Sequence, residues 1–375
     1  MYSASERTPD DERPVAPSLG DIPGLVRFAA DVTEALRYED GVHCFDLGWA
    51  EGSLRGRSPR YTLMVALGFS RAEAASYVLP RPAVAHVDAA LKDPSQLSHG
   101  DKGLAVWVLS RLGDERAVPL LAELALLPDE QLVPLEGMEI AWLVIGCAAA
   151  VEAGFDASSA LHRFLGVLRG RQARRSPLFH HLGTGRGRAL LPNFATQVYS
   201  LLALADVARI TNDAESLRGA RALGDLLVEL RRADAGWPWL FHAEKGSVVE
   251  EYQVYSVHQD AMAPMAYFAL ADATGDRADA RSGAEGLPWC FGANELDFQF
   301  YDAEMRFAHR AIRRAGWADR AELWINTGAG LAGVSRRAKV GKPEINTTCR
   351  PYHLGWVMEA WAGRESNIDL LGATR

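Results

Sequence analysis

The sequence is poor in cysteine and has no long apolar run. Its 375 residues include four cysteines, Cys44, Cys147, Cys290 and Cys349, and no two of them form a CxxC pair. A secreted disulfide framework needs several closely spaced cysteines, so this pattern argues against one. The first 20 residues lack the apolar core of a signal peptide, and no later run is long enough to span a membrane. We therefore expect a cytoplasmic protein whose first 20 residues are disordered.

A basic charge excess is also missing. The formal net charge is -8, and the arginine clusters are short and local. Proteins that bind nucleic acids usually carry a basic face, so we expect no nucleic-acid partner. The P-loop and GxSxG motifs are absent, which removes two common signatures of nucleotide binding and hydrolysis. The composition, with 48% hydrophobic and 23% charged residues, is that of an ordinary globular protein.

The pattern that the sequence does contain is helical. From Ile22 onward, apolar residues recur at spacings of three and four, and Ala and Leu are abundant. Gly, Pro and Asp lie between the periodic segments, as expected where helices start and stop. The predicted helices cover residues 22–38, 58–70, 81–92, 101–113, 115–126, 135–154, 158–170, 194–211, 214–232, 257–274, 277–288, 300–315 and 352–363.

The predicted helices fall into two classes. Six are apolar nearly all round, and they start near Arg60, Gly103, Met138, Ala195, Asp260 and His353. The helices between them, such as the one that starts at Ser216, have a charged face. This alternation predicts an all-α fold, an (α/α)6 toroid in which an outer ring wraps an inner ring, as one domain over residues 21–375. Long connections at 171–193, 233–256 and 316–351 interrupt the ring.

The inner helices start with polar residues. Inner helices of such a toroid run in one direction, so their N-termini converge on one mouth and favour bound anions. The polar residues at these starts include Glu139, Asn193, Gln197, Tyr199, Tyr255, His258, Gln259, Asp260, Arg350, Tyr352 and His353. Each of them alone also suits helix capping or a buried hydrogen bond. Their recurrence at several helix starts favours a functional site.

The stretch from Gly236 to Leu270 holds the strongest candidates. Asp260 falls in the first turn of a predicted helix, where a partly buried carboxyl can serve as a general acid or base. We predict Glu139, or alternatively Glu136, at the start of a neighbouring inner helix, as the second carboxylate of a glycosidase pair. The predicted catalytic residues are Asp260, His258, Glu139 and Tyr255.

The two tryptophans of the same stretch suit a sugar, because sugar rings stack on flat aromatic faces. The alternative is that the Gly-Trp-Pro-Trp segment only packs the loop onto the core. The predicted substrate-binding residues are Trp237, Trp239, Gln259, Asn193, Gln197, Tyr199, Arg350, Tyr352 and His353.

The alternating helices, together with the motifs GWPWLF, YSVHQDAMAP and RPYHLGW, resemble the six-hairpin glycosidase-like superfamily of (α/α)6 toroids. Within it they are similar to an uncharacterised bacterial branch encoded near polysaccharide or glycoconjugate genes. The superfamily contains glycoside hydrolases, unsaturated uronyl hydrolases, polysaccharide lyases and sugar 2-epimerases, whose active sites lie in the mouth. The resemblance implies a carbohydrate substrate. It assigns no residue roles, because no catalytic motif of one family matches residue by residue.

The leading hypothesis is a glycoside hydrolase-type enzyme that acts on an oligosaccharide or glycoconjugate without a cofactor or metal. The nearest alternative is a sugar epimerase or uronate lyase with a His/Tyr acid–base pair. A non-catalytic toroid that binds a glycan or a protein is a further alternative. The oligomeric state stays open.

Two remote alternatives share the toroid architecture. A zinc-dependent lanthionine cyclase-like protein would use Cys290, Cys349 and His353, but here the later Cys and His are four residues apart rather than adjacent. A terpene cyclase-like toroid needs a DxDD or DDxxD run inside the cavity. The pair Asp10 and Asp11 lies instead in the N-terminal segment.

Overall fold

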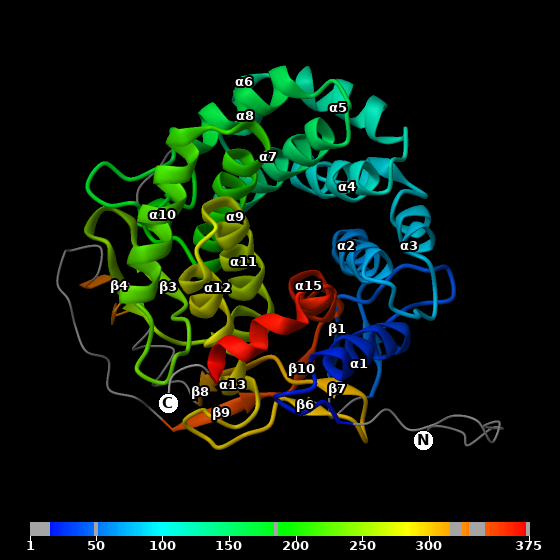
Figure 1. The fold of residues 1–375 in the computed structure, drawn as a ribbon, viewed down its shortest axis with the longest axis vertical. Helices are drawn as coiled ribbons and strands as arrows, with labels where there is room; N and C mark the ends of the chain where they lie inside the picture. Colours follow the sequence, from blue (N-terminus) through cyan, green and yellow to red (C-terminus); the bar gives the residue numbers. More distant parts are fainter. Residues whose placement is uncertain are drawn as a thin grey trace.

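The computed structural model describes residues 16–48, 52–183, 187–315, 325–326, 328–329 and 342–372. Within these residues, six helices form a closed inner ring and six further helices lie against its outer side (Figure 1). The segment predicted to be disordered, residues 1–20, lies mostly outside the described residues. Most of the predicted connection 316–351 lies outside them as well.

The inner ring consists of α2 (Pro59–Ala74), α4 (His99–Arg111), α7 (Gly137–Glu152), α9 (Phe194–Thr211), α11 (Ala263–Thr274) and α15 (Pro351–Trp361). Each of these helices packs on the next, and α15 closes the ring against α2. These are the six helices predicted to be apolar all round, and their side chains are buried on nearly every face. The predicted all-α toroid is therefore confirmed.

The outer helices are α1 (Ile22–Ala35), α3 (Ala83–Ala90), α5 (Ala117–Ala125), α8 (Ser158–Arg169), α10 (Ala214–Glu229) and α12 (Arg277–Ala284). Five of them follow an inner helix and pack on it, whereas α1 packs on α15, from the other end of the chain. Short helices α6 (Asp129–Leu132) and α13 (Leu287–Cys290) lie between them. None of the described helices has the length and apolar character needed to cross a membrane.

Glycines allow the inner helices to approach closely. A Cβ atom at Gly68 of α2 would collide with the carbonyl oxygen of Gly355 on α15. A Cβ atom at Gly146 of α7 would collide with the carbonyl oxygen of Gly103 on α4. Because backbone meets backbone at these crossings, larger residues there would force neighbouring helices apart.

Short strands lie in the connections that run from an outer helix to the next inner helix. They are β1 (Asp46–Gly48), β2 (Leu54–Arg55), β3 (Leu240–His242), β4 (Ser247–Glu250), β5 (Val254–Tyr255), β6 (Tyr301–Asp302), β7 (Phe307–Ala308), β8 (Ala311–Arg314), β9 (Pro343–Asn346) and β10 (Thr348–Cys349). The described sheets are all antiparallel, with orders β10-β1-β2, β3-β4, β5-β8-β9 and β6-β7. They build the rim around the N-terminal ends of the inner helices.

The prediction of a helix over residues 300–315 is wrong. The segment forms β6 and β7, which pair with each other, and then β8, which pairs with β5 and β9. The spacing of Arg306, His309 and Arg310 fits a helix. However, the backbone of β8 forms hydrogen bonds with two strands that are distant in the sequence. Tertiary pairing thus overrides the local pattern. As a result, Arg310 lies at the mouth of the ring rather than on an outer helix.

Candidate active site

A cavity of about 290 Å³ lies where the inner helices begin. Side chains from α2, α7, α9 and α15 line it, together with a π-helical turn (His258–Met262) that leads into α11. Its lining residues are Arg60, Tyr61, Met64, Met138, Trp142, Asn193, Ala195, Tyr199, Trp239, Tyr255, His258, Met262, Arg310, Arg350 and Tyr352. We call it the mouth cavity. Among the described residues that line it, there is no carboxylate.

Three guanidinium groups face the mouth cavity. Arg60 pairs with Asp101, and with Glu139 at 2.9 Å. By contrast, within the described part of the chain no carboxylate lies within ion-pair distance of Arg310 or Arg350. Among the described residues, these two positive charges therefore have no matching negative charge, at a point where helix N-termini add further positive potential.

Aromatic rings hold these two arginines in place. Arg350 donates a hydrogen bond to the Tyr61 hydroxyl at 2.8 Å, and its guanidinium lies 4.2 Å from the centre of the Phe45 ring. Arg310 lies 5.1 Å from the centre of the Tyr255 ring. The buried Nε atoms of both arginines make no hydrogen bond to the described residues. Stacking orients the charges but leaves hydrogen-bonding capacity for a ligand.

His258 and Tyr255 form an uncharged pair at the edge of this positive region. Their ring centres are 5.0 Å apart. Burial and the positive charge of Arg310 lower the pKa of His258 to about 3, so the imidazole is neutral at neutral pH. Burial raises the pKa of Tyr255 although the Arg310 charge opposes this effect, so the phenol keeps its proton. One group can therefore accept a proton and the other can donate one.

The floor of the mouth cavity is aromatic. Trp142 and Tyr199 line it with ring centres 5.4 Å apart. Beneath them, the fully buried Trp356 lies 6.0 Å from Tyr199 and 5.8 Å from Trp107. This aromatic layer fills the centre of the ring and separates the mouth cavity from the opposite end.

Asp260 lies behind the cavity wall. Its side chain is 0% exposed and is not part of the lining. Its carboxylate accepts hydrogen bonds from Nε2 of His353 at 2.9 Å, from the Tyr301 hydroxyl at 2.6 Å and from the Cys290 thiol at 3.2 Å. Burial and the Asp260 charge together raise the pKa values of Tyr301 and Cys290, which keeps both groups protonated as donors. This geometry suits the orientation of His353 rather than contact with a sugar bond.

Besides Asp260, five predicted site residues lie outside the cavity lining: His353, Glu139, Trp237, Gln259 and Gln197. Trp237 is 0% exposed and stacks between Phe194 and Tyr267. The Gln259 amide bridges the Trp237 N–H and the Tyr255 carbonyl. Gln197 bridges the N–H and carbonyl of Phe179 in the same way. These residues support the wall.

Glu139 is a helix cap as well as an ion-pair partner. Its carboxylate accepts a hydrogen bond from the backbone N–H of Glu136, in a capping box at the start of α7. The same carboxylate pairs with Arg60, and its side chain is only 12% exposed. The predicted pair of Asp260 and Glu139 therefore does not flank the mouth cavity.

Seven predicted site residues do line the cavity: Tyr255, His258, Trp239, Asn193, Tyr199, Arg350 and Tyr352. The prediction missed several lining residues, above all Arg310, which was assigned to a helix that does not form. Trp142 lies on a predicted inner helix, and a turn-by-turn projection of that helix onto the mouth would have found it.

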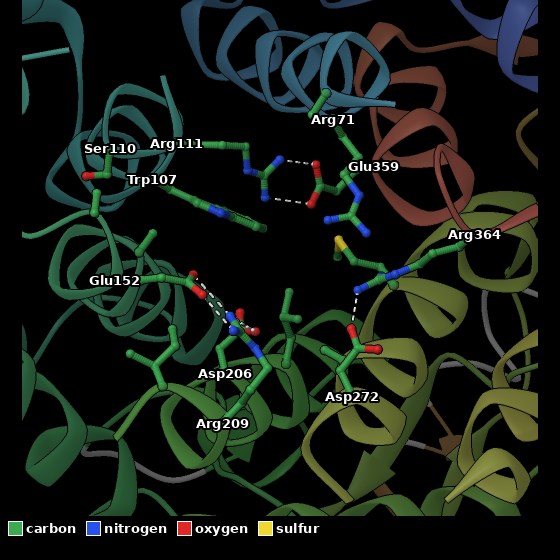
Figure 2. A pocket seen from close by; sticks show the side chains of 17 residues that line it. Arg71, Trp107, Ser110, Arg111, Glu152, Asp206, Arg209, Asp272, Glu359 and Arg364 are labelled. Atoms are coloured by element: carbon green, nitrogen blue, oxygen red, sulfur yellow. Dashed lines mark hydrogen bonds and ion pairs between the residues drawn. The ribbon is translucent and has the colours of Figure 1, made fainter. Parts of the chain in front are cut away.

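A second cavity, of about 620 Å³, opens at the opposite end of the ring, where the inner helices end (Figure 2). We call it the rear cavity. Arginine and acidic side chains from several inner helices surround it. None of the residues predicted for the site lines this cavity.

The described residues contain no group of three or more His, Cys, Asp or Glu side chains placed to hold a metal ion. Cys290 contacts Asp260, and Cys349 is buried, so the three residues considered for zinc form no such group.

No protein-family model matches the sequence, and no curated protein is detectably similar to it. Solved structures are similar over nearly the whole chain. An unsaturated glucuronyl hydrolase specific for heparin is 13% identical with a TM-score of 0.59, over 93% of this chain and 98% of that one. A sugar epimerase from a ruminal bacterium is 10% identical with a TM-score of 0.58, over 92% and 98%.

A D-mannose isomerase is 11% identical with a TM-score of 0.59, over 90% of this chain and 96% of that one. These likenesses establish the fold. The chain has the same (α/α)6 toroid fold as these three structures.

Proposed function

We propose that the protein is a carbohydrate-active enzyme that moves a proton on an acidic sugar bound in the mouth cavity, as an epimerase or isomerase. One observation carries this proposal. An uncharged pair, His258 and Tyr255, lies beside two guanidiniums, Arg310 and Arg350, for which the described residues provide no carboxylate partner.

The guanidiniums favour a substrate with a negative charge. Burying a cation without a partner costs free energy, and a bound carboxylate would offset this cost through charge-assisted hydrogen bonds. The planar guanidinium matches the two oxygens of a carboxylate. A sugar acid is the substrate class that combines such a group with hydroxyls for Asn193 and a ring for Trp239.

The uncharged pair supports proton transfer. In the proposed step, His258 takes a proton from a carbon next to a carbonyl or carboxylate, and the electron pair moves onto oxygen to give an enolate. The nearby guanidiniums stabilise the oxygen charge. Return of a proton from Tyr255 to the opposite face of that carbon gives an epimer, and return to the adjacent carbon gives an isomer.

The substrate itself would adjust the basicity of His258. The Arg310 charge contributes to the low pKa of the free imidazole, so a bound anion that offsets this charge would raise it. Binding would thus make His258 a better base only when an acidic sugar is present.

The names of the similar structures support a sugar substrate, and one of them names an acidic sugar unit. Two of them are named as a sugar epimerase and a D-mannose isomerase, and the third is named for a glucuronyl unit. Each is similar to this chain in fold, and the proposal itself rests on the mouth cavity.

A glycoside hydrolase is the second candidate. Arg60, which lines the cavity, holds the carboxylates of Asp101 and Glu139 next to it. Release of Glu139 from Arg60 would bring a carboxylate to the mouth, and hydrolysis usually requires two such groups. Proton transfer needs no such rearrangement, and this favours the first candidate.

Solvent-deuterium exchange tests the proposal. The protein is incubated in D2O with D-glucuronate, D-galacturonate and D-mannuronate, and with neutral D-glucose and D-mannose, and the sugars are followed by NMR. We expect deuterium to enter an acidic sugar at a carbon next to its carbonyl or carboxylate. The His258→Gln variant should lose this exchange.

A parallel assay for new reducing ends on acidic oligosaccharides addresses the hydrolase. Release of reducing ends without deuterium exchange would reject the proposal in favour of the second candidate. Binding of the sugars with neither reaction would instead indicate a carbohydrate-binding protein.

A further inference from the structure

The rear cavity is built from charged side chains at the C-terminal ends of the inner helices (Figure 2). Its charged lining residues are Arg71, Arg111, Glu152, Asp206, Arg209, Asp272, Glu359 and Arg364. Trp107, Met265 and Leu202 contribute apolar surface. Cations near helix C-termini are favourable, so the presence of arginine here has a structural reason.

Most of these charges are matched. Glu359 accepts hydrogen bonds from both terminal nitrogens of Arg111. Glu152 accepts two from Arg209, at 2.6 and 3.1 Å. Such two-point contacts hold the side chains in fixed positions.

The third ion pair, between Arg364 and Asp272, is 2.5 Å long. With this pair, three cations and three carboxylates of the rear cavity satisfy one another. One cation and one carboxyl group remain.

The remaining cation is Arg71. Its Nε donates to the carbonyl oxygen of Ala362 at 3.2 Å, but no carboxylate of the described residues lies within 4 Å of its guanidinium. Burial lowers the pKa of Arg71, although the Glu359 charge opposes this effect. The guanidinium thus keeps terminal N–H groups available beside the cavity.

The remaining carboxyl group is Asp206. Its nearest cation, Arg209, is 4.0 Å away and already bound to Glu152. Burial raises the pKa of Asp206 to about 6, although the Arg209 charge opposes this effect. In Figure 2, Arg71 and Asp206 lie on opposite sides of the cavity, and the Trp107 ring projects toward it from the side of Arg111.

We propose that the rear cavity is a second binding site, for a small polyhydroxy carboxylate of the sugar-acid class. The carboxylate would bind Arg71, the protonated Asp206 would donate a hydrogen bond to a hydroxyl, and the carbon chain would lie against Trp107. A volume of about 620 Å³ accommodates such a molecule. The site is independent of the proposed reaction, because the aromatic layer of Trp356 and Tyr199 separates the two cavities.

The charge on Asp206 gives the site a pH dependence. The charged groups around Asp206 are Arg209, Arg111, Arg364, Arg71, Glu152, Asp272 and Glu359. When Asp206 ionises as the pH rises, it repels a bound carboxylate. A sugar acid is already ionised in this range, so its affinity should be higher below pH 6 than above it.

Isothermal titration calorimetry tests the proposal with D-gluconate as the probe. The titration uses the full chain with Arg310→Gln and Arg350→Gln, which removes the unpaired cations of the mouth cavity. We expect one bound gluconate per chain. Addition of Arg71→Gln should weaken its affinity by about tenfold or more, the loss expected for a charge-assisted contact.

Further variants separate binding from folding. Arg71→Lys keeps the positive charge and should bind gluconate more tightly than Arg71→Gln. Arg81→Gln, on the outer surface, should leave the affinity unchanged. Thermal melting of each variant shows whether it is folded at the titration temperature.

Two results would overturn the proposal. One is no gluconate binding up to about 10 mM, and the other is equal gluconate affinity of the proteins with and without Arg71→Gln. Titrations at about pH 5 and about pH 8 test the second contact. The affinity should fall several-fold at the higher pH, and Asp206→Asn should abolish this fall. An unchanged pH dependence in Asp206→Asn would remove Asp206 from the site.

Discussion

At the N-terminal mouth of the ring, two of the three guanidiniums face the cavity with no carboxylate partner among the described residues. At the opposite mouth, which is the rear cavity, three of the four guanidiniums are paired with a carboxylate. The helix termini make this contrast sharper. A cation opposes the potential at a helix N-terminus and is favoured at a C-terminus.

The paired arginines stabilise the fold, whereas the arginines without a carboxylate partner do not. The pairs of Arg111, Arg209 and Arg364 stabilise the fold at the end where cations are already favoured. Arg310 and Arg350 instead hold positive charge where the fold gains least from it. Groups that cost stability without a structural return are typical of functional sites, and for this reason we propose that the substrate binds at the N-terminal mouth.

The largest expected effect is the loss of catalysis at the N-terminal mouth. His258→Gln removes the proposed base and should lower kcat about 100- to 10,000-fold on the acidic sugar that the protein turns over. Measurement of kcat by NMR checks this value. His162→Gln, on the exposed face of an outer helix, is the matched control and should keep full activity. Equal activity of both variants would exclude His258 as the base.

The next effect is a loss of stability at the opposite mouth. Glu359→Gln breaks the two-point contact with Arg111 and leaves that cation unpaired. We expect the free energy of unfolding to fall by about 3 kcal/mol, at the lower end of the range for buried pairs because Arg111 is partly exposed. Urea denaturation measures it. Glu123→Gln, which breaks an exposed pair with Lys102, should cost less than about 1 kcal/mol.

Removal of a cation from the N-terminal mouth should lower activity and leave stability nearly unchanged. Arg310→Gln is expected to lower kcat/KM for an acidic sugar about 10- to 100-fold. The free energy of unfolding should hardly change, because no carboxylate of the described residues loses its partner. Arg313→Gln, at an exposed position on β8, three residues after Arg310, should leave kcat/KM unchanged. A destabilised but fully active Arg310→Gln variant would show that this arginine is structural.

The smallest expected effect is a difference between the two mouths in how the free energy of unfolding depends on pH. The folded pKa of His258 is about 3, below the ordinary value of 6.5, so its contribution to stability is lost as the pH falls below 6.5. The folded pKa of Asp206 is about 6, above its ordinary value of 3.8, so its contribution increases as the pH falls through 6. Each amounts to roughly 1–2 kcal/mol between pH 7 and pH 5.

Denaturation of the variants at both pH values separates these contributions. Over this range, His258→Gln should lose less stability on acidification than the unmodified protein. Asp206→Asn should lose more. The same response in both variants would contradict the assigned ionisation states.

The sequence predicted the ring well because the ring depends on local pattern. Helices that are apolar on all faces must be buried, whereas those with one charged face must lie outside, and this rule identified all six inner helices. Polar residues at the helix starts then located the mouth. Seven of the predicted residues line it, since residues at helix starts point toward the same end of the ring.

The errors in the prediction arose where contacts between distant parts of the sequence determine the structure. Arg310 lies on a segment whose strand structure depends on β5 and β9, and no local pattern specifies that pairing. Asp260 has the position of an acid or base in the helix, but the side chains of Tyr301, His353 and Cys290 enclose it. These donors come from distant parts of the chain, so its burial could not be read from its neighbours in the sequence.

The central claim is that the unpaired cations of the N-terminal mouth bind the acidic group of a sugar. The most direct test is a crystal structure of the His258→Gln variant, which should not turn the sugar over, with D-glucuronate. We predict that the carboxylate lies within hydrogen-bond distance of Arg310 and Arg350, with the sugar ring against Trp239. A sugar bound only at the opposite mouth, or one whose carboxylate faces solvent, would contradict the claim.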